Sequence, residues 1–223
     1  MVAVMVLATF IIFVLVDYYL QRRKPQFEQV VASTQESEAP VFPLSVVGGF
    51  KLPASLSFHP GHTWAQKESK QAVRIGLDDF AARLVGQLDQ IELPARGRWL
   101  RQGERAWTVT RGEHHFEMLS PIEGEVVDIN DQAVRDPSLA HLDPYGAGWL
   151  VAVNAPAVDA NLKNLLRGRL AQRWMEESVG ALHSRISPGS GIRLQDGGRA
   201  IADVLSVVPE RQWEKVVREL FLT

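Results

Sequence analysis

A chain of 223 residues, 46% of them hydrophobic and 22% charged, is long enough to bury one full β core and to leave material for flanking segments. Its formal charge of -2 at pH 7 gives no bulk attraction to a polyanion, which argues against nucleic acid as a partner. The absence of cysteine excludes disulfides, thiolate metal sites and cysteine nucleophiles.

The chain begins with a long apolar run. Residues 1–16 contain only apolar side chains and Thr9, and the apolar character resumes after Asp17 with Tyr18, Tyr19 and Leu20. Twenty residues make a helix about 30 Å long, which is the thickness of the hydrocarbon core of a bilayer. A cleaved signal peptide would instead need a preceding positive charge and a small-residue cleavage site. We therefore expect residues 1–20 to form a single transmembrane span.

Basic residues follow the span directly, at Arg22, Arg23 and Lys24. Because positive charge next to a span tends to remain in the cytoplasm, the C-terminal domain is expected on the cytoplasmic side. Asp17 lies close to this basic flank and is expected at the interface rather than in a functional intramembrane site. Residues 1–24 are thus predicted to be a membrane anchor with a basic flank.

Residues 25–56 are mixed and turn-rich, as in a linker. Their one apolar patch, residues 41–47, is compatible with a short strand or with a docking segment. Beyond this linker, short alternating segments separated by glycine or proline predict strands of a compact sandwich or barrel at 72–75, 87–93, 106–111, 115–119, 125–129 and 148–153. A helix is expected at 78–84, with Asp78 as its N-cap and with Phe80 and Leu84 on one face.

After Pro156 the pattern becomes helical. Apolar residues at three- and four-residue spacing predict a helix that starts near Asp159 or Asn161 and runs to about residue 186. A glycine- and proline-rich break follows, and a last helix is expected from Pro209 onward. Both apolar faces are expected to pack on the β core, and a partner surface is the alternative.

Five groups of residues occur in one order over about a hundred positions and together resemble the glycine cleavage H protein family. They are His62-Thr63-Trp64, the segment 73–81, the frame of Gly86, Glu92-Leu93-Pro94, Gly97 and Gly103-Glu104, the segment 121–126 with Asn130, and Asp143-Pro144-Tyr145-Gly146 with Gly148-Trp149-Leu150. Each group alone is weak evidence, whereas five in register are specific for a fold.

The resemblance covers residues 57–160 and implies a mainly β, lipoyl-type domain, a barrel-sandwich hybrid. Residues 161–223 would then be a helical extension. Members of the family shuttle an aminomethyl group between enzymes on a lipoyl arm, which an amide joins to a lysine at the tip of a β-hairpin. A chain of this kind is a carrier and not an enzyme.

This sequence departs from the family at that hairpin tip. Counting eight residues back from Pro121, as the family pattern requires, gives Glu113 and not lysine. Gly112 at the start of the turn suits a II′-type hairpin. A carboxylate cannot be acylated by a lipoyl ligase, so the resemblance implies a scaffold without lipoate. No cofactor is expected, and Gly112, Glu113, His114 and His115 are the candidate partner-facing tip.

Metal and catalytic sites are not expected. His59 and His62 bracket a Pro-Gly turn, and two histidines alone make an incomplete zinc site. At the hairpin, His115 and Glu117 share one face of a strand whereas His114 faces the other way, so few ligands converge. No phosphate-binding glycine loop, serine nucleophile motif or pair of carboxylates stands out elsewhere in the sequence.

Three hypotheses follow. The first is a non-catalytic scaffold or binding module, held at the cytoplasmic membrane face, that recruits a protein partner. The second is a true aminomethyl carrier that serves glycine cleavage enzymes through an unconventional lipoyl lysine, with lipoate as its cofactor. The third is a structural subunit of a larger membrane complex, in which the anchor packs against other helices.

Overall fold

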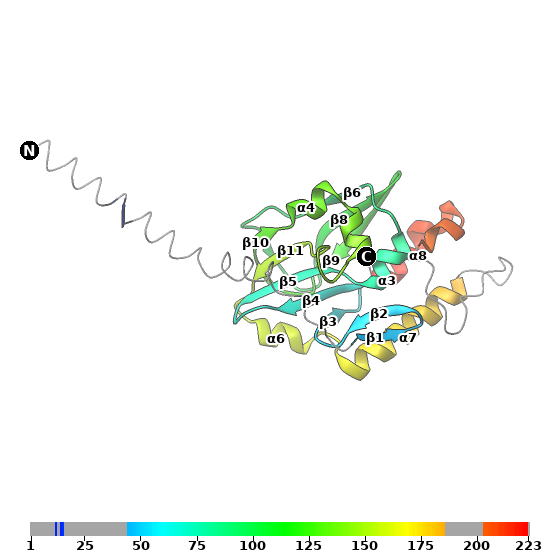
Figure 1. Cartoon of the computed structure of the whole chain (residues 1–223), viewed down its shortest axis with the longest axis horizontal. Coiled ribbons are helices and arrows are strands. Elements are labelled where there is room, and N and C mark those ends of the chain that lie inside the picture. The colour runs from blue at the N-terminus through cyan, green and yellow to red at the C-terminus, as the bar shows by residue number, and fades with distance from the viewer. Residues whose placement is uncertain (1–11, 13, 16–43, 186–202, 223) are drawn as a thin grey trace, which may run out of the picture. The chain divides into compact units, whose positions relative to one another are not determined.

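The structure is a computed structural model that describes residues 12, 14–15, 44–185 and 203–222 (Figure 1). The expected transmembrane span lies outside the described residues, apart from Ile12, Val14 and Leu15, which are helical. In the part of the chain that the structure describes, no helix combines the length and the apolar character needed to cross a bilayer.

The largest sheet has six antiparallel strands in the order β3-β4-β5-β11-β10-β7. These strands are β3 (Ser57–His59), β4 (Thr63–Lys67), β5 (Ala72–Leu77), β7 (Trp99–Leu100), β10 (Gly124–Ile129) and β11 (Val151–Asn154). Its central strands carry the alternating apolar residues noted in the sequence, and Val73, Ile75, Val151 and Val153 are fully buried. The expected β core is therefore present.

A second sheet has three strands in the order β6-β8-β9. Strand β6 (Gln90–Glu92) pairs with β8 (Arg105–Arg111), which forms a hairpin with β9 (His114–Leu119). The inner face of this hairpin packs into the core through Trp107, Val109, Phe116 and Met118. The two sheets together give the mainly β domain that was predicted.

Helix α3 (Asp79–Val85) confirms the predicted helix and its cap. Asp78 accepts a hydrogen bond from the backbone N–H of Ala81 at 2.7 Å, and Phe80 and Leu84 are fully buried. The side chain of Asp78 also bonds Nδ1 of His62 at 2.8 Å. This one buried carboxylate thus joins the helix to the turn between β3 and β4.

The predicted linker ends earlier than residue 56. Strands β1 (Leu44–Val47) and β2 (Phe50–Pro53) form an antiparallel hairpin inside it, which agrees with the strand alternative for the apolar patch. Phe50 and Leu52 are buried in the main core, and the hydroxyl of Tyr145 donates to the carbonyl of Lys51 at 2.8 Å. The glycine pair favoured a linker, but Gly48 and Gly49 form the turn of this hairpin.

The expected single helix after residue 159 is two helices. Helix α6 (Val158–Lys163) ends before α7 (Gly168–Arg185), because Leu166 leaves the helix and exchanges two backbone hydrogen bonds with Phe58. Two short helices, α4 (Asp131–Arg135) and α5 (Ser138–Leu142), were not predicted. Their five-residue length is too short for a helical period to show in the sequence.

The last helix, α8 (Trp213–Phe221), follows two 3-10 turns, η1 (Leu205–Val207) and η2 (Glu210–Gln212). The helix begins four residues after Pro209, where a start was expected. Its apolar face, formed by Val216, Val217, Leu220 and Phe221, is buried against strand β9 and helix α3. Packing on the chain's own core, rather than on a partner, is therefore confirmed for α8.

Candidate functional site

The tip of the β8–β9 hairpin is a two-residue turn. Arg111 pairs with His114, so Gly112 and Glu113 alone connect the strands. The backbone of Gly112 has φ +58°, and Glu113 is not among the residues with positive φ. A positive φ at the first turn residue only is the II′ geometry that the sequence predicted. Glu113 thus stands at the apex.

The side chains around the apex divide between two faces of the hairpin. Gly112, Glu113 and His115 are exposed to solvent. His114 lies on the other face, where its ring stacks parallel to Phe116 at 6.2 Å between centroids. The prediction that His114 and His115 face opposite ways is confirmed, since His115 instead bonds Thr110 through Nδ1 at 3.0 Å.

Two carboxylates far from the apex in sequence fasten the hairpin to the rest of the domain. Asp89 accepts a hydrogen bond from the backbone N–H of Gly112 at 2.6 Å. Asp203 accepts hydrogen bonds from both terminal nitrogens of the Arg111 guanidinium, at 2.6 and 2.8 Å. The same guanidinium donates to the carbonyl of Val85. Sequence reasoning missed both acids, because nothing local marks partners that are 23 and 92 positions away.

His114 makes a second set of contacts with the C-terminal part of the chain. Its Nε2 lies 3.2 Å from a carboxylate oxygen of Glu210, and its Nδ1 lies 3.8 Å from Glu214. The ring of Trp213 packs against His114 at 5.1 Å, and the guanidinium of Arg111 lies over the same indole at 4.7 Å. The guanidinium over the indole is a cation-π contact, which attracts Arg111 to Trp213.

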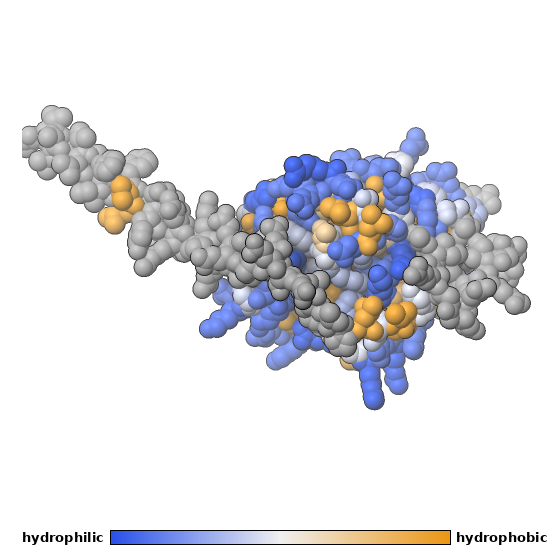
Figure 2. Space-filling view, in the orientation of Figure 1, coloured by the Kyte–Doolittle hydropathy of each residue, from blue (hydrophilic) through white to orange (hydrophobic). Residues whose placement is uncertain are grey.

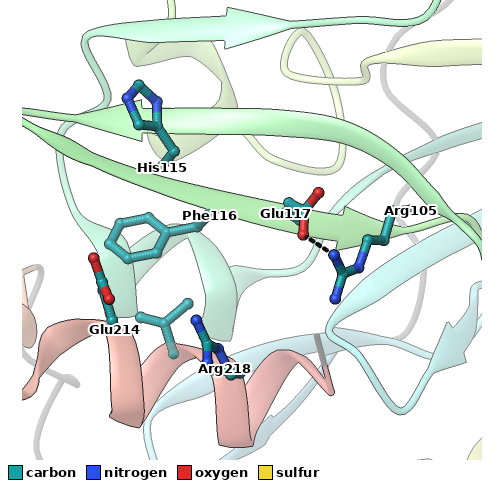
Figure 3. A pocket seen from close by; sticks show the side chains of 7 residues that line it. Arg105, His115, Phe116, Glu117, Glu214 and Arg218 are labelled. Atoms are coloured by element: carbon teal, nitrogen blue, oxygen red, sulfur yellow. Dashed lines mark ion pairs between the residues drawn. The ribbon is translucent and has the colours of Figure 1, made fainter.

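A groove of about 330 Å³ runs along the seam between β9 and α8 (Figure 3). Figure 3 shows Phe116 directed toward α8 and His115 directed away from it, while Glu214 and Arg218 rise from the helix. Arg105 and Glu117 close one end with an ion pair at 2.7 Å. Charges of both signs line the groove, so it has no strong preference for anions or cations.

None of the lysines lies in the hairpin. Lys51 is in β2, Lys67 ends β4, Lys70 is in the following turn, Lys163 is in α6 and Lys215 is in α8, while Lys24 lies outside the described residues. Lys67 forms an ion pair with Asp159 at 2.6 Å. An acyl group forms an amide only with an amine, so Glu113 at the apex cannot carry an acyl arm through an amide bond.

The two histidines of the turn between β3 and β4 have structural roles. His62 is fully buried between the rings of Phe80 and Trp174, at 4.2 and 4.6 Å. His59 accepts a hydrogen bond from the backbone N–H of Gly61 through Nδ1, and burial, with a smaller effect of His62, lowers its pKa. Among the described residues, no three histidine or carboxylate side chains are grouped so as to hold a metal.

The surface outside the hairpin offers no large apolar patch on the face seen in Figure 2, where hydrophobic residues form small areas separated by hydrophilic ones. The described large hydrophobic residues that are exposed on the folded domain are Leu44, Val46, Trp99, Val134, Leu142, Leu170 and Leu222. Leu44 and Val46 share one face of the short strand β1, and the other five each lie on or directly after a different element. The tip and its seam with α8 therefore remain the best-defined candidate site.

Comparison with known proteins places this fold in a family. The model of the glycine cleavage H-protein family matches residues 56–178, more than half of the chain. The glycine cleavage system H protein of Chromobacterium violaceum is 34% identical over 115 residues, which are 52% of this chain and 89% of that protein. Its counterpart from Thermobifida fusca is 36% identical over 111 residues, 50% of this chain and 87% of that protein. The chain belongs to the glycine cleavage H-protein family.

A solved structure of the H protein of Mycobacterium marinum is 31% identical, with a TM-score of 0.45, and the match covers 48% of this chain and 87% of that one. The family match ends at residue 178, inside α7. Strands β1 and β2 and residues 203–222 therefore lie outside the part that this chain shares with its family. H proteins are carriers rather than catalysts, in agreement with the expectation of a non-enzyme.

Proposed function

We propose that this chain is a non-lipoylated H-protein-like module that presents a fixed hairpin tip to a protein partner. The observation that carries the proposal is the exposed carboxylate of Glu113 at the apex, at the position that the family pattern assigns to the lipoyl lysine. A carboxylate offers hydrogen-bond acceptors and negative charge but no attachment point for an arm. The family scaffold would then serve recognition and not transport.

The partner-binding role is tested by affinity purification of the full-length chain from detergent-solubilised membranes. The wild-type chain is expected to retain a stoichiometric protein partner. The double variant Glu113→Arg with His115→Ala should lose it, because it reverses the charge of the apex and removes its second exposed polar side chain.

The matched control is Lys163→Glu, which also reverses one exposed charge but on α6. This control should retain the partner at the wild-type level. Recovery of no stable partner, or equal recovery by the tip variant and the wild type, would contradict the role of the tip.

We further propose that the domain is tethered to the membrane through residues 1–20 and lies on the cytoplasmic side. The support is the length of the apolar run and the basic residues that follow it. Protease added to intact cells is then expected to leave the domain whole, and to digest it only after the membrane is opened. Digestion in intact cells would overturn this topology.

Membership of the H-protein family also supports a second candidate, an aminomethyl carrier that uses an unconventional lipoyl lysine. Lys67 at the end of β4 and Lys70 in the following turn are both exposed to solvent, although Lys67 forms an ion pair with Asp159. Under this reading the partners would be glycine cleavage enzymes. A lipoyl adduct on any lysine of the native protein would establish it in place of the first proposal.

A further inference from the structure

The β8–β9 hairpin is held on one face by a segment that the family match does not include. Residues 203–222, named here the C-terminal clamp, follow the end of that match at residue 178. The clamp contacts both residues that flank the apex turn: Asp203 binds Arg111, and Glu210 binds His114. Trp213 lies against both side chains at once.

The strongest polar contact of the clamp is the ion pair between Arg111 and Asp203. The pair of Arg111 and Asp203 is bidentate and only partly exposed, with 17% and 35% of the two side chains accessible. Bidentate pairs between arginine and a carboxylate combine charge with fixed orientation, so they resist both rotation and separation. Residue 204 adds a backbone hydrogen bond from the N–H of Val204 to the carbonyl of Arg83, at 3.0 Å.

The apolar side of the clamp anchors it to the same part of the domain. Val217 and Phe221 are essentially inaccessible to solvent, and α8 lies along β9. The approach is close at the end of α8, since a Cβ added to Gly61 would lie 2.8 Å from the carbonyl oxygen of Phe221. The clamp is therefore seated in the core and not loosely laid over the hairpin.

We propose that the C-terminal clamp immobilises the hairpin tip, so that Glu113 is presented as a fixed point and the face of His114 and Phe116 is closed to any partner. This inference rests on the proposed function, in which the tip is the contact surface. A free hairpin can bend into a partner's cleft, whereas a clamped one must be met by a partner shaped to its rigid outer face. Release of the clamp would then free the tip to move and uncover the face of His114 and Phe116.

Hydrogen exchange of the full-length chain tests the clamp directly. The double variant Asp203→Asn with Glu210→Gln keeps the shapes of both side chains but removes the negative charge of the two carboxylates that contact the hairpin. Because a hydrogen bond to a charged group is stronger than one between neutral groups, amides of residues 109–116 should exchange about tenfold faster or more. Amides of β5 and β11 should keep the wild-type rate and so report that the core is intact.

Glu219→Gln is the matched control, since it removes an ion pair of the same helix with Arg185, 2.7 Å long, that does not involve the hairpin. This variant should leave exchange in the hairpin at the wild-type rate. An unchanged hairpin in the double variant, or an equal rise in the control, would overturn the proposal.

A spin label gives a second measure that does not depend on exchange. The chain has no cysteine, so Glu113→Cys provides a single labelling site at the apex. The label should have a broad, immobile spectrum in the clamped chain and a narrower one when the two clamp substitutions are added. Identical spectra would count against the clamp. Neither readout depends on lipoate. These experiments can therefore refute the clamp while the chain is still found without lipoate, and a lipoyl adduct can be found while the clamp is confirmed.

Discussion

At the residue scale, His59 shows how one turn couples protonation to stability. Its Nδ1 accepts a hydrogen bond from the N–H of Gly61 at 3.0 Å, and a proton on that nitrogen would break the bond. Burial, and to a lesser degree the nearby His62, lowers the pKa of His59 below its usual 6.5. The folded protein therefore binds fewer protons than the unfolded chain below about pH 6.5, and stability is lost as the pH falls through the pKa of the folded state.

His59→Asn is expected to make stability less sensitive to acid. The amide oxygen of asparagine can accept from the N–H two residues on, as in an Asx turn, while the titrating group is removed. Unfolding by denaturant between pH 5 and 8 measures the difference. The free energy of unfolding should fall more steeply with decreasing pH for the wild type than for the variant. Parallel curves would show that His59 is not a source of the acid sensitivity.

At the residue scale, one part of the candidate site could be predicted from the sequence and another part could not. The hairpin apex was predictable, because Gly112 suits the turn locally and the family pattern, counted back from Pro121, gives the adjacent position 113. The contacts that hold the apex were not, because Asp203 and Glu210 are 92 and 96 positions from their partners. Local patterns carry no information about such pairings, which depend on how helix α8 returns to the sheet.

At the element scale, Asp78 stabilises the N-terminus of α3 and its attachment to the β3–β4 turn. One carboxylate oxygen caps the helix through the N–H of Ala81, and the other bonds the buried ring of His62. Asp78→Ala removes a cap and leaves a buried ring nitrogen without its partner, so the free energy of unfolding should fall by about 2–4 kcal/mol. Chemical denaturation followed by circular dichroism measures this loss.

Asp78→Asn serves as the comparison, because its amide keeps an acceptor for the helix cap. Asparagine is about as good an N-cap as aspartate, so most of the remaining loss would come from the contact with His62. The asparagine variant should therefore lose less stability than the alanine variant. Equal stability of Asp78→Ala and the wild type would contradict the role given to this side chain.

Elements were predictable where periodicity is long or capping is clear. Helix α3 and strands β5, β8, β9 and β10 lie within one or two residues of their expected bounds. The helix expected from residue 159 was wrong as one piece, because the backbone of Leu166 pairs with Phe58. The apolar pattern after residue 159 correctly predicts that this part of the chain has a buried face. It does not reveal that the backbone of Leu166 forms hydrogen bonds with strand β3 in place of helical ones.

At the scale of the whole molecule, the β1–β2 hairpin belongs to the core and not to a tether. Phe50 has 1% of its surface exposed and lies 4.9 Å from the ring of Phe80, between centroids. Phe50→Ala is expected to lower the free energy of unfolding by about 3–5 kcal/mol, because it opens a cavity in a shared core. Thermal and chemical denaturation of the full-length chain measure this change.

Lys51→Ala is the neighbouring control. Its side chain is exposed, while its backbone keeps the hydrogen bonds with Asp79 and Tyr145. The change in stability should stay within about 0.5 kcal/mol. If Phe50→Ala were as mild as this control, residues 44–53 would not be part of the cooperative unit.

The central claim concerns the chemistry of the hairpin apex, and intact-mass spectrometry of the protein purified from its native source tests it most directly. The account predicts a chain without any lipoyl adduct, because position 113 offers no amine and the described lysines lie outside the hairpin. A measured mass that includes a lipoyl group on any lysine would contradict it.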